Sequence, residues 1–314
     1  MEAKRVLLLG GTGTIGRATA KALIGAGHSV TAITRASSDA LAGCDQRIGP
    51  VTDPAFLNQV VGLGVDAIVS CLASRTGTPQ DAWAIDHDAN LAALRAAQDA
   101  RVPQFILLSA ICVQKPLLEF QRAKLAFEAA LQSSGLTFSI IRPTAFFKSL
   151  SGQIGRLRAG KPFLVFGDGR LTACKPISDA DLARFLTLCL TDADKRNRIL
   201  PIGGPGPALT PLDQGRLLAD ALGVDLKVRH VPPALLSGIA TGLDLVGRIV
   251  PALGTKAALA RIGHYYATES MLLWDGHRYN ARATPSFGTD TLAGHYAAAA
   301  RGDTADDRGA HAVF

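Results

Sequence analysis

The sequence predicts an α/β fold, in which a doubly wound parallel sheet is followed by a smaller, partly interleaved C-terminal domain. Through the first half of the 314 residues, short apolar runs alternate with segments of helical periodicity. That alternation is typical of parallel strands joined by crossover helices, which cover both faces of the sheet. The pattern becomes irregular from about Phe146, where glycine- and proline-rich turns separate shorter elements.

The expected strands are apolar runs bounded by turn residues. We expect them at Val6–Leu9, Ser29–Thr34, Ala67–Ser70, Gln104–Ser109 and Thr137–Ile141. Helical periodicity fills the intervals, around Ala18, Phe56, Leu91 and Phe127. Together these elements predict a first domain over residues 1–145, with ligands bound beyond the carboxyl ends of its strands.

The later residues are expected to form a second domain and a tail. The second domain spans residues 146–296, with some segments returning to the first sheet, and residues 297–314 are small, polar and charged, which predicts disorder. The apolar segment Ala234–Leu253 is interrupted by two charges and a proline, so we interpret it as a buried helix and not a membrane span. Contact with a membrane surface or an apolar ligand is the alternative.

The composition indicates a globular protein that binds small anions. Hydrophobic residues make up 48% and charged residues 19%, which allows a large core. The net charge of +7 is spread without a basic block, which favours an anionic small ligand and argues against nucleic acid. The five cysteines include no C-x-x-C pair, so we expect reduced thiols, no disulfide and no metal site. The first strand begins after five residues, so we expect no signal or transit peptide and a cytoplasmic protein.

The most informative segment joins the first strand to the first helix, where glycines stand at positions 10, 13 and 16. Gly10 allows a tight reversal, Gly13 admits a pyrophosphate close to the backbone, and Gly16 allows the helix to pack on the strand. The helix N-terminus adds N–H donors and positive potential. We therefore predict a Rossmann-like dinucleotide site; an ordinary tight turn is the alternative. The same loop supplies the further cofactor-binding residues Thr12, Thr14 and Ile15.

The end of the second strand indicates which dinucleotide is bound. Arg35 stands nineteen positions after Gly16, where an NAD enzyme usually carries a carboxylate for the ribose 2′-hydroxyl. A guanidinium pairs bidentately with a 2′-phosphate, so we predict NADPH as the cofactor. We expect assistance from Arg17, Ser37 and Ser38. The alternative is that Arg35 is only a solvated charge.

The glycine spacing and a later lysine resemble the extended and atypical branches of the short-chain dehydrogenase/reductase superfamily. Its members usually carry Y-x-x-x-K on a helix, and this spacing places the phenol and the ammonium on one face. Here the window runs from Phe120 to Lys124, so the lysine is retained and the phenol is replaced. Because Phe120 cannot transfer a proton, carbonyl reduction by the tyrosine route is disfavoured.

Residues at the other strand ends complete the expected cofactor site. They are Ser70, Leu72, Ala73, Ser109, Pro143 and Thr144, joined by Lys124, which can bind the nicotinamide ribose. Lys124 is also the expected catalytic proton donor, directly or through water, in a dry, basic site that disfavours its charge. The alternative is an exposed helical lysine. Lesser candidates are Lys115, Cys112 and Lys148.

Longer blocks of sequence resemble one family within this superfamily. They cover residues 70–75, 83–86, 108–124, 142–150, 166–169, 173–178 and 200–206. From the glycine loop to about Leu292 the chain resembles the divinyl chlorophyllide a 8-vinyl reductase family, in which the phenylalanine at the tyrosine position is part of the pattern. The resemblance implies NADPH-dependent reduction of the 8-vinyl group of a divinyl chlorophyllide or protochlorophyllide to ethyl, in chlorophyll or bacteriochlorophyll synthesis.

The resemblance also implies a location and a substrate site. Plant members carry an N-terminal chloroplast extension that this chain lacks, which implies a bacterial cytoplasmic enzyme; contact with a photosynthetic membrane is left open. Aromatic rings suit a flat macrocycle, although such residues are more often part of the core. The expected substrate-binding residues are Trp83, Phe120, Phe146 and Phe147, with Tyr265 and Tyr266 as further candidates. His230 or His264 could give the substrate magnesium an axial ligand, although a lone histidine is usually structural.

Two other functions are compatible with the residues. A non-catalytic NADP(H)-binding regulator or assembly factor is favoured by Phe120, but the retained Lys124 and the long family-like blocks argue against it. An NADPH-dependent reductase of another conjugated alkene would keep the cofactor site and change only the substrate cleft. The sequence leaves the oligomeric state open.

Overall fold

The computed structural model describes residues 2–247 and 251–303. Contacts divide the chain into two units. Unit 1 consists of residues 2–74, 79–143 and 179–201, and unit 2 of residues 75–78, 144–178 and the described residues from 202 onward. The chain thus leaves unit 1 and returns to it before completing unit 2.

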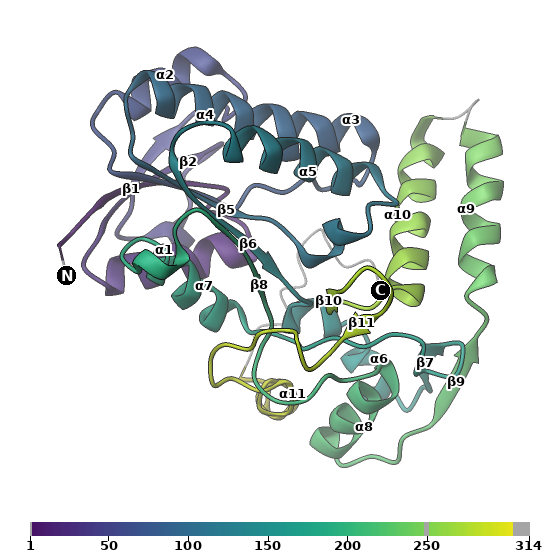
Figure 1. Cartoon of the computed structure of the whole chain (residues 1–314). Helices are drawn as coiled ribbons and strands as arrows, with labels where there is room; N and C mark the ends of the chain where they lie inside the picture. The colour runs from purple at the N-terminus through teal and green to yellow at the C-terminus, as the bar shows by residue number, and fades with distance from the viewer. Residues whose placement is uncertain (1, 248–250, 304–314) are drawn as a thin grey trace. The chain divides into compact units, whose positions relative to one another are not determined.

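Unit 1 is built on a seven-stranded sheet (Figure 1). In spatial order its strands are β3 (Asp45–Ile48), β2 (Ser29–Thr34), β1 (Arg5–Leu9), β4 (Ala67–Ser70), β5 (Gln104–Leu108), β6 (Thr137–Pro143) and β8 (Arg198–Ile202). The first six pair in parallel. The α/β doubly wound prediction is therefore confirmed, and the order reverses beside β1, where such sheets bind ligands.

Helices cover both faces of this sheet. The helices α2 (Pro54–Val61), α4 (Asn90–Asp99) and α5 (Glu119–Gln132) lie on one face, and α1 (Thr14–Gly25) and α7 (Asp179–Leu188) lie on the other (Figure 1). Leu57, Ala93 and Phe127 from the first group pack with the strand residues Leu7 and Phe105 in one buried cluster. The crossover helices thereby fix where each strand ends.

The two edge strands were not predicted from the sequence. β3 reads Asp-Gln-Arg-Ile and is mostly exposed, and β8 contains Pro201. Both features are normal at sheet edges, because an edge strand has one unpaired side and can face water. Hydrophobic alternation identifies buried strands, so it misses these two.

Unit 2 contains smaller sheets and helices. β7 (Phe163–Phe166) pairs in parallel with β9 (Val228–Val231), and β10 (Leu273–Trp274) pairs with β11 (Tyr279–Asn280). The helices are α6 (Ile154–Arg158), α8 (Pro211–Leu222), α9 (Ala234–Gly247), α10 (Pro251–Thr268) and α11 (Leu292–Arg301). Within the described ranges, no helix combines the length and the apolarity that crossing a membrane requires.

The expectation of a buried helix over Ala234–Leu253 is wrong at its start. Leu235 and Ile239 in α9 are 53% and 44% exposed. α9 packs on α10, and a helix packed mainly on one face leaves side chains on its other faces exposed. Residues 248–250 of the predicted segment lie outside the described residues.

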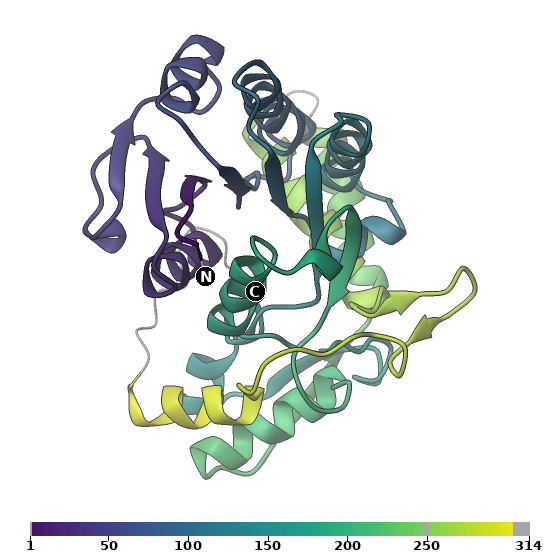
Figure 2. The same ribbon diagram turned by 60° about the vertical axis from the view of Figure 1, so that its left-hand side comes forward.

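The expectation of a tail from residue 297 is wrong as far as Arg301. Helix α11 continues to that residue, begins with a Thr291 side-chain cap, and lies beside α8 (Figure 2). The small residues 297–300 resemble the composition of a tail, but they are alanines, which are the best helix formers. Tyr296 and Ala299 give the helix a buried face. Residues 304–314 of the expected tail lie outside the described residues.

Tyr296 allows a test of this helix. Its side chain is 0% exposed and its hydroxyl donates to the Leu150 carbonyl at 2.8 Å. We expect Tyr296→Ala to lower the free energy of unfolding by about 3–5 kcal/mol, because it leaves a large cavity. Tyr296→Phe should cost about 1 kcal/mol through the lost hydrogen bond. Denaturant unfolding measures both; a neutral Tyr296→Ala would contradict the packing of α11.

Candidate functional site

The glycine loop after β1 shows two different requirements for glycine. Gly10 has φ +73°, and a Cβ there would lie 2.6 Å from the Cys71 carbonyl oxygen. A Cβ on Gly16 would lie 2.2 Å from the Gly10 carbonyl oxygen. Both contacts are impossible, so these glycines are required by the fold itself. They let β1, the loop and α1 approach each other closely.

Gly13 is not required by the fold. A Cβ there would meet only the Gly10 carbonyl oxygen, at an ordinary 3.4 Å, and its φ of −71° suits any residue. Gly13 is exposed and forms the N-cap of α1 without a side-chain cap, and the first turn carries no acidic residue. A helix start of this kind attracts anions, and a glycine there admits a phosphate close to the backbone. Thr12 is also exposed, whereas Ile15 is buried.

The carboxyl end of β2 carries Arg35 on the surface, next to the buried Thr34. The Thr34 hydroxyl has no hydrogen-bond partner within the described part of the chain. Gln46 of β3 fixes the following loop, because its side-chain amide bonds both the N–H and the carbonyl of Ser38, at 2.9 and 3.0 Å. The sequence analysis did not identify Gln46. The exposed Arg35 guanidinium and the buried Thr34 hydroxyl thus lie at the end of β2, the strand that pairs with β1.

The end of β4 is tied to the helices that follow it. The buried Ser70 hydroxyl donates to the Asn90 side-chain oxygen at 2.5 Å. The Asn90 amide in turn donates to the carbonyls of Ile85 and Asp86, each at 3.2 Å. Ser70 and Asn90 therefore shape the backbone after β4. Leu72 lies within this network, since its N–H faces the Ser70 oxygen at 3.4 Å.

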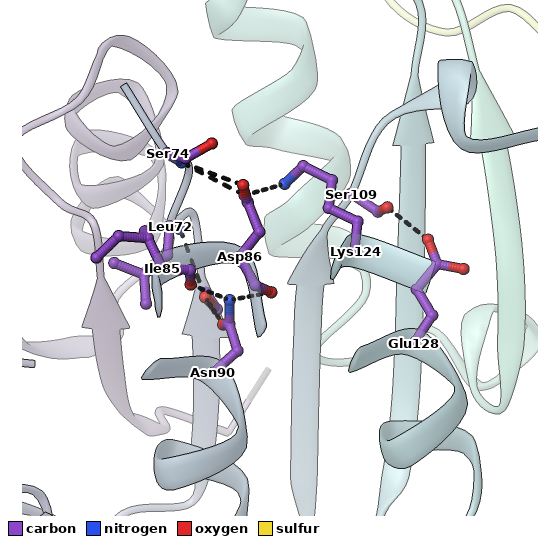
Figure 3. Close-up of polar contacts among 9 residues, drawn as sticks. Leu72, Ser74, Ile85, Asp86, Asn90, Ser109, Lys124 and Glu128 are labelled. Atoms are coloured by element: carbon purple, nitrogen blue, oxygen red, sulfur yellow. Dashed lines mark hydrogen bonds and ion pairs between the residues drawn. The ribbon is translucent and has the colours of Figure 1, made fainter. Parts of the chain in front are cut away.

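Lys124 is buried, so the interpretation as an exposed helical lysine is wrong. Its side chain runs toward Asp86, and Nζ lies 2.9 Å from Oδ1 (Figure 3). Lys124 is 9% exposed and Asp86 1% exposed. The premise of a basic environment is wrong as well, because the nearest charged partner is a carboxylate. Asp86 lies in the π-helix Trp83–Ala89, which follows the short helix α3 (Pro79–Ala82).

Ser109, at the end of β5, is engaged with a second buried carboxylate. Its hydroxyl donates to Glu128 Oε1 at 2.5 Å (Figure 3). The Arg142 guanidinium forms an ion pair with the same carboxylate. An ionised carboxylate only accepts hydrogen bonds, so the single proton of Ser109 is directed to Glu128 and away from any ligand. The sequence analysis assigns no role to Glu128 or Asp86. The available signal for Glu128 is a carboxylate within an otherwise apolar helix pattern, whereas Asp86 stands beside the polar His87 and Asp88 and gives no such signal.

The expected substrate-binding aromatic residues differ in exposure. Trp83 is 37% exposed and its indole N–H donates to Glu119 at 3.2 Å, and Phe120 is half-buried one turn before Lys124. Phe146, in unit 2, is half-buried, whereas Phe147 belongs to the core cluster around Tyr296. Burial of Phe147 within that cluster gives it a packing role. Tyr265 is likewise buried, and Tyr266 is exposed.

The remaining predicted residues are partly engaged in backbone contacts. Pro143 ends β6 and is buried. Thr144 is buried in unit 2, where its hydroxyl donates to the Lys175 carbonyl, and Ala73 is exposed after β4. The His230 ring lies 2.8 Å from the Gly167 carbonyl and is exposed, and His264 is half-buried. Within the described ranges, no three His, Cys, Asp or Glu side chains are grouped as metal ligands require.

Comparisons with known proteins identify the family. A family model described as NAD(P)H-binding matches residues 10–193. The divinyl chlorophyllide a 8-vinyl-reductase of Arabidopsis thaliana is 46% identical over 93% of this chain and 76% of its own, and that of Zea mays is 47% identical over 91% and 77%. The chain belongs to the divinyl chlorophyllide a 8-vinyl-reductase family.

More distant matches agree with the fold. A leucoanthocyanidin reductase from Vitis vinifera, solved as a ternary complex, has a TM-score of 0.70 at 18% identity, covering 95% of this chain and 99% of that chain. A UDP-glucose 4-epimerase from Thermotoga maritima has a TM-score of 0.68 at 17% identity, covering 95% and 97%. The photosystem II assembly factor Ycf39 of Cyanophora paradoxa is 26% identical over 74% of this chain and 73% of its own. The 8-vinyl-reductase family is distinguished from these proteins by its much higher identity.

Two glycine variants separate folding from ligand binding. We expect Gly16→Ala to lower the free energy of unfolding by about 1–3 kcal/mol, because its Cβ overlaps the Gly10 carbonyl. We expect Gly13→Ala to cost less than about 1 kcal/mol, the loss of a favourable N-cap residue. Gly13→Ala should nevertheless weaken dinucleotide binding at least about ten-fold, since its methyl group occupies the phosphate's place.

Denaturant unfolding and fluorescence titration with NADPH measure the two effects. Unchanged nucleotide affinity in Gly13→Ala would contradict a phosphate site at this glycine.

Proposed function

We propose that this protein reduces the 8-vinyl group of a divinyl chlorophyllide or protochlorophyllide to ethyl, with NADPH as the reductant, in chlorophyll or bacteriochlorophyll synthesis. Membership in the 8-vinyl-reductase family supports the reaction, and the NAD(P)H-binding match supports a nicotinamide cofactor. The single structural observation that carries the proposal is that neither residue 120 nor residue 109 can donate a proton to the substrate. Phe120 cannot donate a proton, and the Ser109 proton is directed to Glu128.

A site with Phe120 and an engaged Ser109 is better suited to the reduction of an alkene than to the reduction of a carbonyl. Reduction of a carbonyl places negative charge on one oxygen, which needs a nearby acid. A bound reduced nicotinamide supplies a hydride, and a vinyl group conjugated with a tetrapyrrole spreads the resulting charge over the macrocycle. Hydride addition at the terminal carbon would leave the inner vinyl carbon to be protonated. The chain's task is to hold the reactants together and to exclude water.

The residues present fit a phosphorylated dinucleotide. The exposed backbone at Gly13 and the helix start that it caps can hold the pyrophosphate. Arg35 is exposed beyond β2, where it can pair with a 2′-phosphate. We therefore propose NADPH in preference to NADH.

Lys124 is the residue we propose for catalysis. Its ammonium can donate to the nicotinamide ribose and can deliver the proton, directly or through an ordered water. Trp83, Phe120 and Phe146 are the aromatic residues we propose for the macrocycle, since each keeps some exposed surface. An axial contact from His230 or His264 to the substrate magnesium stays a weaker proposal. We also propose a bacterial cytoplasmic location, with membrane contact as an open alternative.

A non-catalytic assembly factor is the second candidate. The specific observation in its favour is the 25–26% identity to proteins named photosystem II assembly factor Ycf39. A factor of that kind would bind the nucleotide and leave pigment unchanged. The buried Lys124–Asp86 pair favours the reductase, because a regulator has no need of a positioned ammonium beside the cofactor.

The reaction itself is directly testable. We expect purified protein with NADPH to convert divinyl chlorophyllide to the 8-ethyl pigment, which chromatographic retention and the absorption spectrum detect. One NADPH should be consumed per vinyl group reduced. Pigment that remains divinyl, in the presence of protein that binds NADPH normally, would support the assembly-factor interpretation.

Arg35 tests the choice of nucleotide. We expect Arg35→Asp to weaken NADPH binding at least about ten-fold, because a charge-assisted pair is replaced by repulsion of the 2′-phosphate. NADH, which lacks that phosphate, should bind with nearly unchanged affinity. Arg47→Asp, an exposed cation of β3, is the matched control and should leave the ratio of the two affinities unchanged. Equal losses for both nucleotides in Arg35→Asp would exclude the phosphate contact.

A further inference from the structure

The buried partner of Lys124 is a residue whose role no comparison assigns. We infer that Asp86 is a positioning residue, which holds the Lys124 ammonium at the place where the nicotinamide ribose and the vinyl group of the substrate meet. The inference rests on the proposed function for its substrate. Its structural basis is independent of that function, because it consists of contacts within unit 1.

The contact between the two charges is direct and enclosed. Lys124 Nζ lies 2.9 Å from Asp86 Oδ1, and both side chains are buried. The Ser74 N–H faces both carboxylate oxygens at 3.4 Å, from the loop after β4 (Figure 3). The carboxylate therefore joins the loop after β4 to helix α5. An ammonium has three N–H donors, and Asp86 occupies one, so the others can be directed at a ligand.

The backbone around Asp86 is unusual. Asp86 lies within the π-helix Trp83–Ala89, a wide turn that is rare and often found at functional sites. Asn90 ends this segment and donates to the Asp86 carbonyl, while the Ser70 hydroxyl holds the Asn90 side chain. The end of β4 therefore fixes the π-helix. A continuous α-helix would rotate residue 86 away from its present direction.

A buried ion pair is a poor means of stabilising a protein. The cost of removing both charges from water commonly offsets their attraction, so apolar residues of similar volume can do as well. A lysine side chain is also long and flexible, and it stays in one place only when a partner holds it. The ion pair between Asp86 of the π-helix and Lys124 of helix α5 is therefore better explained by the position that it gives to the ammonium.

Other ionisable groups near the pair do not replace Asp86. Cys71, at the end of β4, faces Lys124, but burial raises the pKa of its thiol to about 12, so the thiol stays neutral near pH 7. Glu128, one turn further along α5, is engaged with Ser109 and Arg142. His87, beside Asp86 in the π-helix, contacts the exposed Asp88. Asp86 is thus the carboxylate that compensates the Lys124 charge.

The experiment compares Asp86→Asn with Asp181→Asn, a matched change of a buried carboxylate in α7 that pairs with Arg184. Without its counter-charge, a buried ammonium loses its proton more readily. We expect Asp86→Asn to lower kcat at least about ten-fold with little change in the pigment KM, since misplacement by 1 Å can cost about 100-fold. The alkaline limb of its kcat profile should move to lower pH. Asp181→Asn should reduce the melting temperature and leave the profile in place.

A second readout needs neither cofactor nor pigment. Mass spectrometry can follow the acetylation of Lys124 by a small amine-reactive reagent, which reacts only with the uncharged amine. We expect Asp86→Asn to increase this labelling rate at least about ten-fold near pH 8, equivalent to one unit in proton affinity. Labelling of the exposed Lys21 serves as the internal reference, and Asp181→Asn should match the parent protein.

Asp86→Glu covers the case in which Asp86→Asn fails to fold. It keeps the charge and moves it by one methylene, so we expect a lower kcat with the alkaline limb unchanged. Parent-like kcat in either folded variant would overturn the positioning role. If the parent protein makes no ethyl pigment but Lys124 labelling still depends on Asp86, the proposed function fails and the positioning of Lys124 stands.

Discussion

The architecture of the candidate site depends on the neutralisation of two carboxylates that helices bury near the strand ends. Asp86 and Glu128 lie almost entirely out of water, and each has a cationic partner within unit 1. An unpaired charge in such a place would cost several kcal/mol, so the partners cannot be lost separately. One pair joins helix α5 to the π-helix, and the other joins it to β6. The Ser74 N–H and the Ser109 hydroxyl extend these contacts to the loop after β4 and to the end of β5. Helix α5 is therefore fixed by polar contacts as well as by its apolar face.

The sequence predicted the parts of the fold that arise from local pattern. The strands Ser29–Thr34 and Ala67–Ser70 were located to the residue, and steric contacts at Gly10 and Gly16 explain why the glycine loop is recognisable. Hydrophobic alternation is lost at exposed sheet edges, which is why β3 and β8 were missed. The alanines of α11 were misread because their burial depends on α8, far away in the sequence.

The polar contacts of Lys124 and Glu128 are less predictable, because they too join segments that lie far apart in the sequence. Lys124 could be singled out from its spacing to Phe120, but its partner lies 38 positions earlier, in a π-helix that no simple periodicity reveals. The Ser109–Glu128 contact similarly joins the end of a strand to the middle of a helix. Contacts of this kind follow from tertiary packing. The sequence marks only Glu128, as a carboxylate among apolar residues; Asp86 stands beside other polar residues.

The engaged Ser109 hydroxyl and the apolar Phe120 ring indicate how one scaffold can serve different reductions. A serine that gives its proton to Glu128 is a poor donor to a developing oxyanion, and a phenylalanine gives none. Such a site would be defective for a carbonyl, in which charge develops on a single atom and oxyanion stabilisation is the largest catalytic contribution. For a vinyl group conjugated with a macrocycle the charge is spread over many atoms, so local acid groups matter less and exact placement matters more. A rigidly held ammonium is consistent with that requirement, because it can orient the cofactor without offering a strong acid to an oxygen.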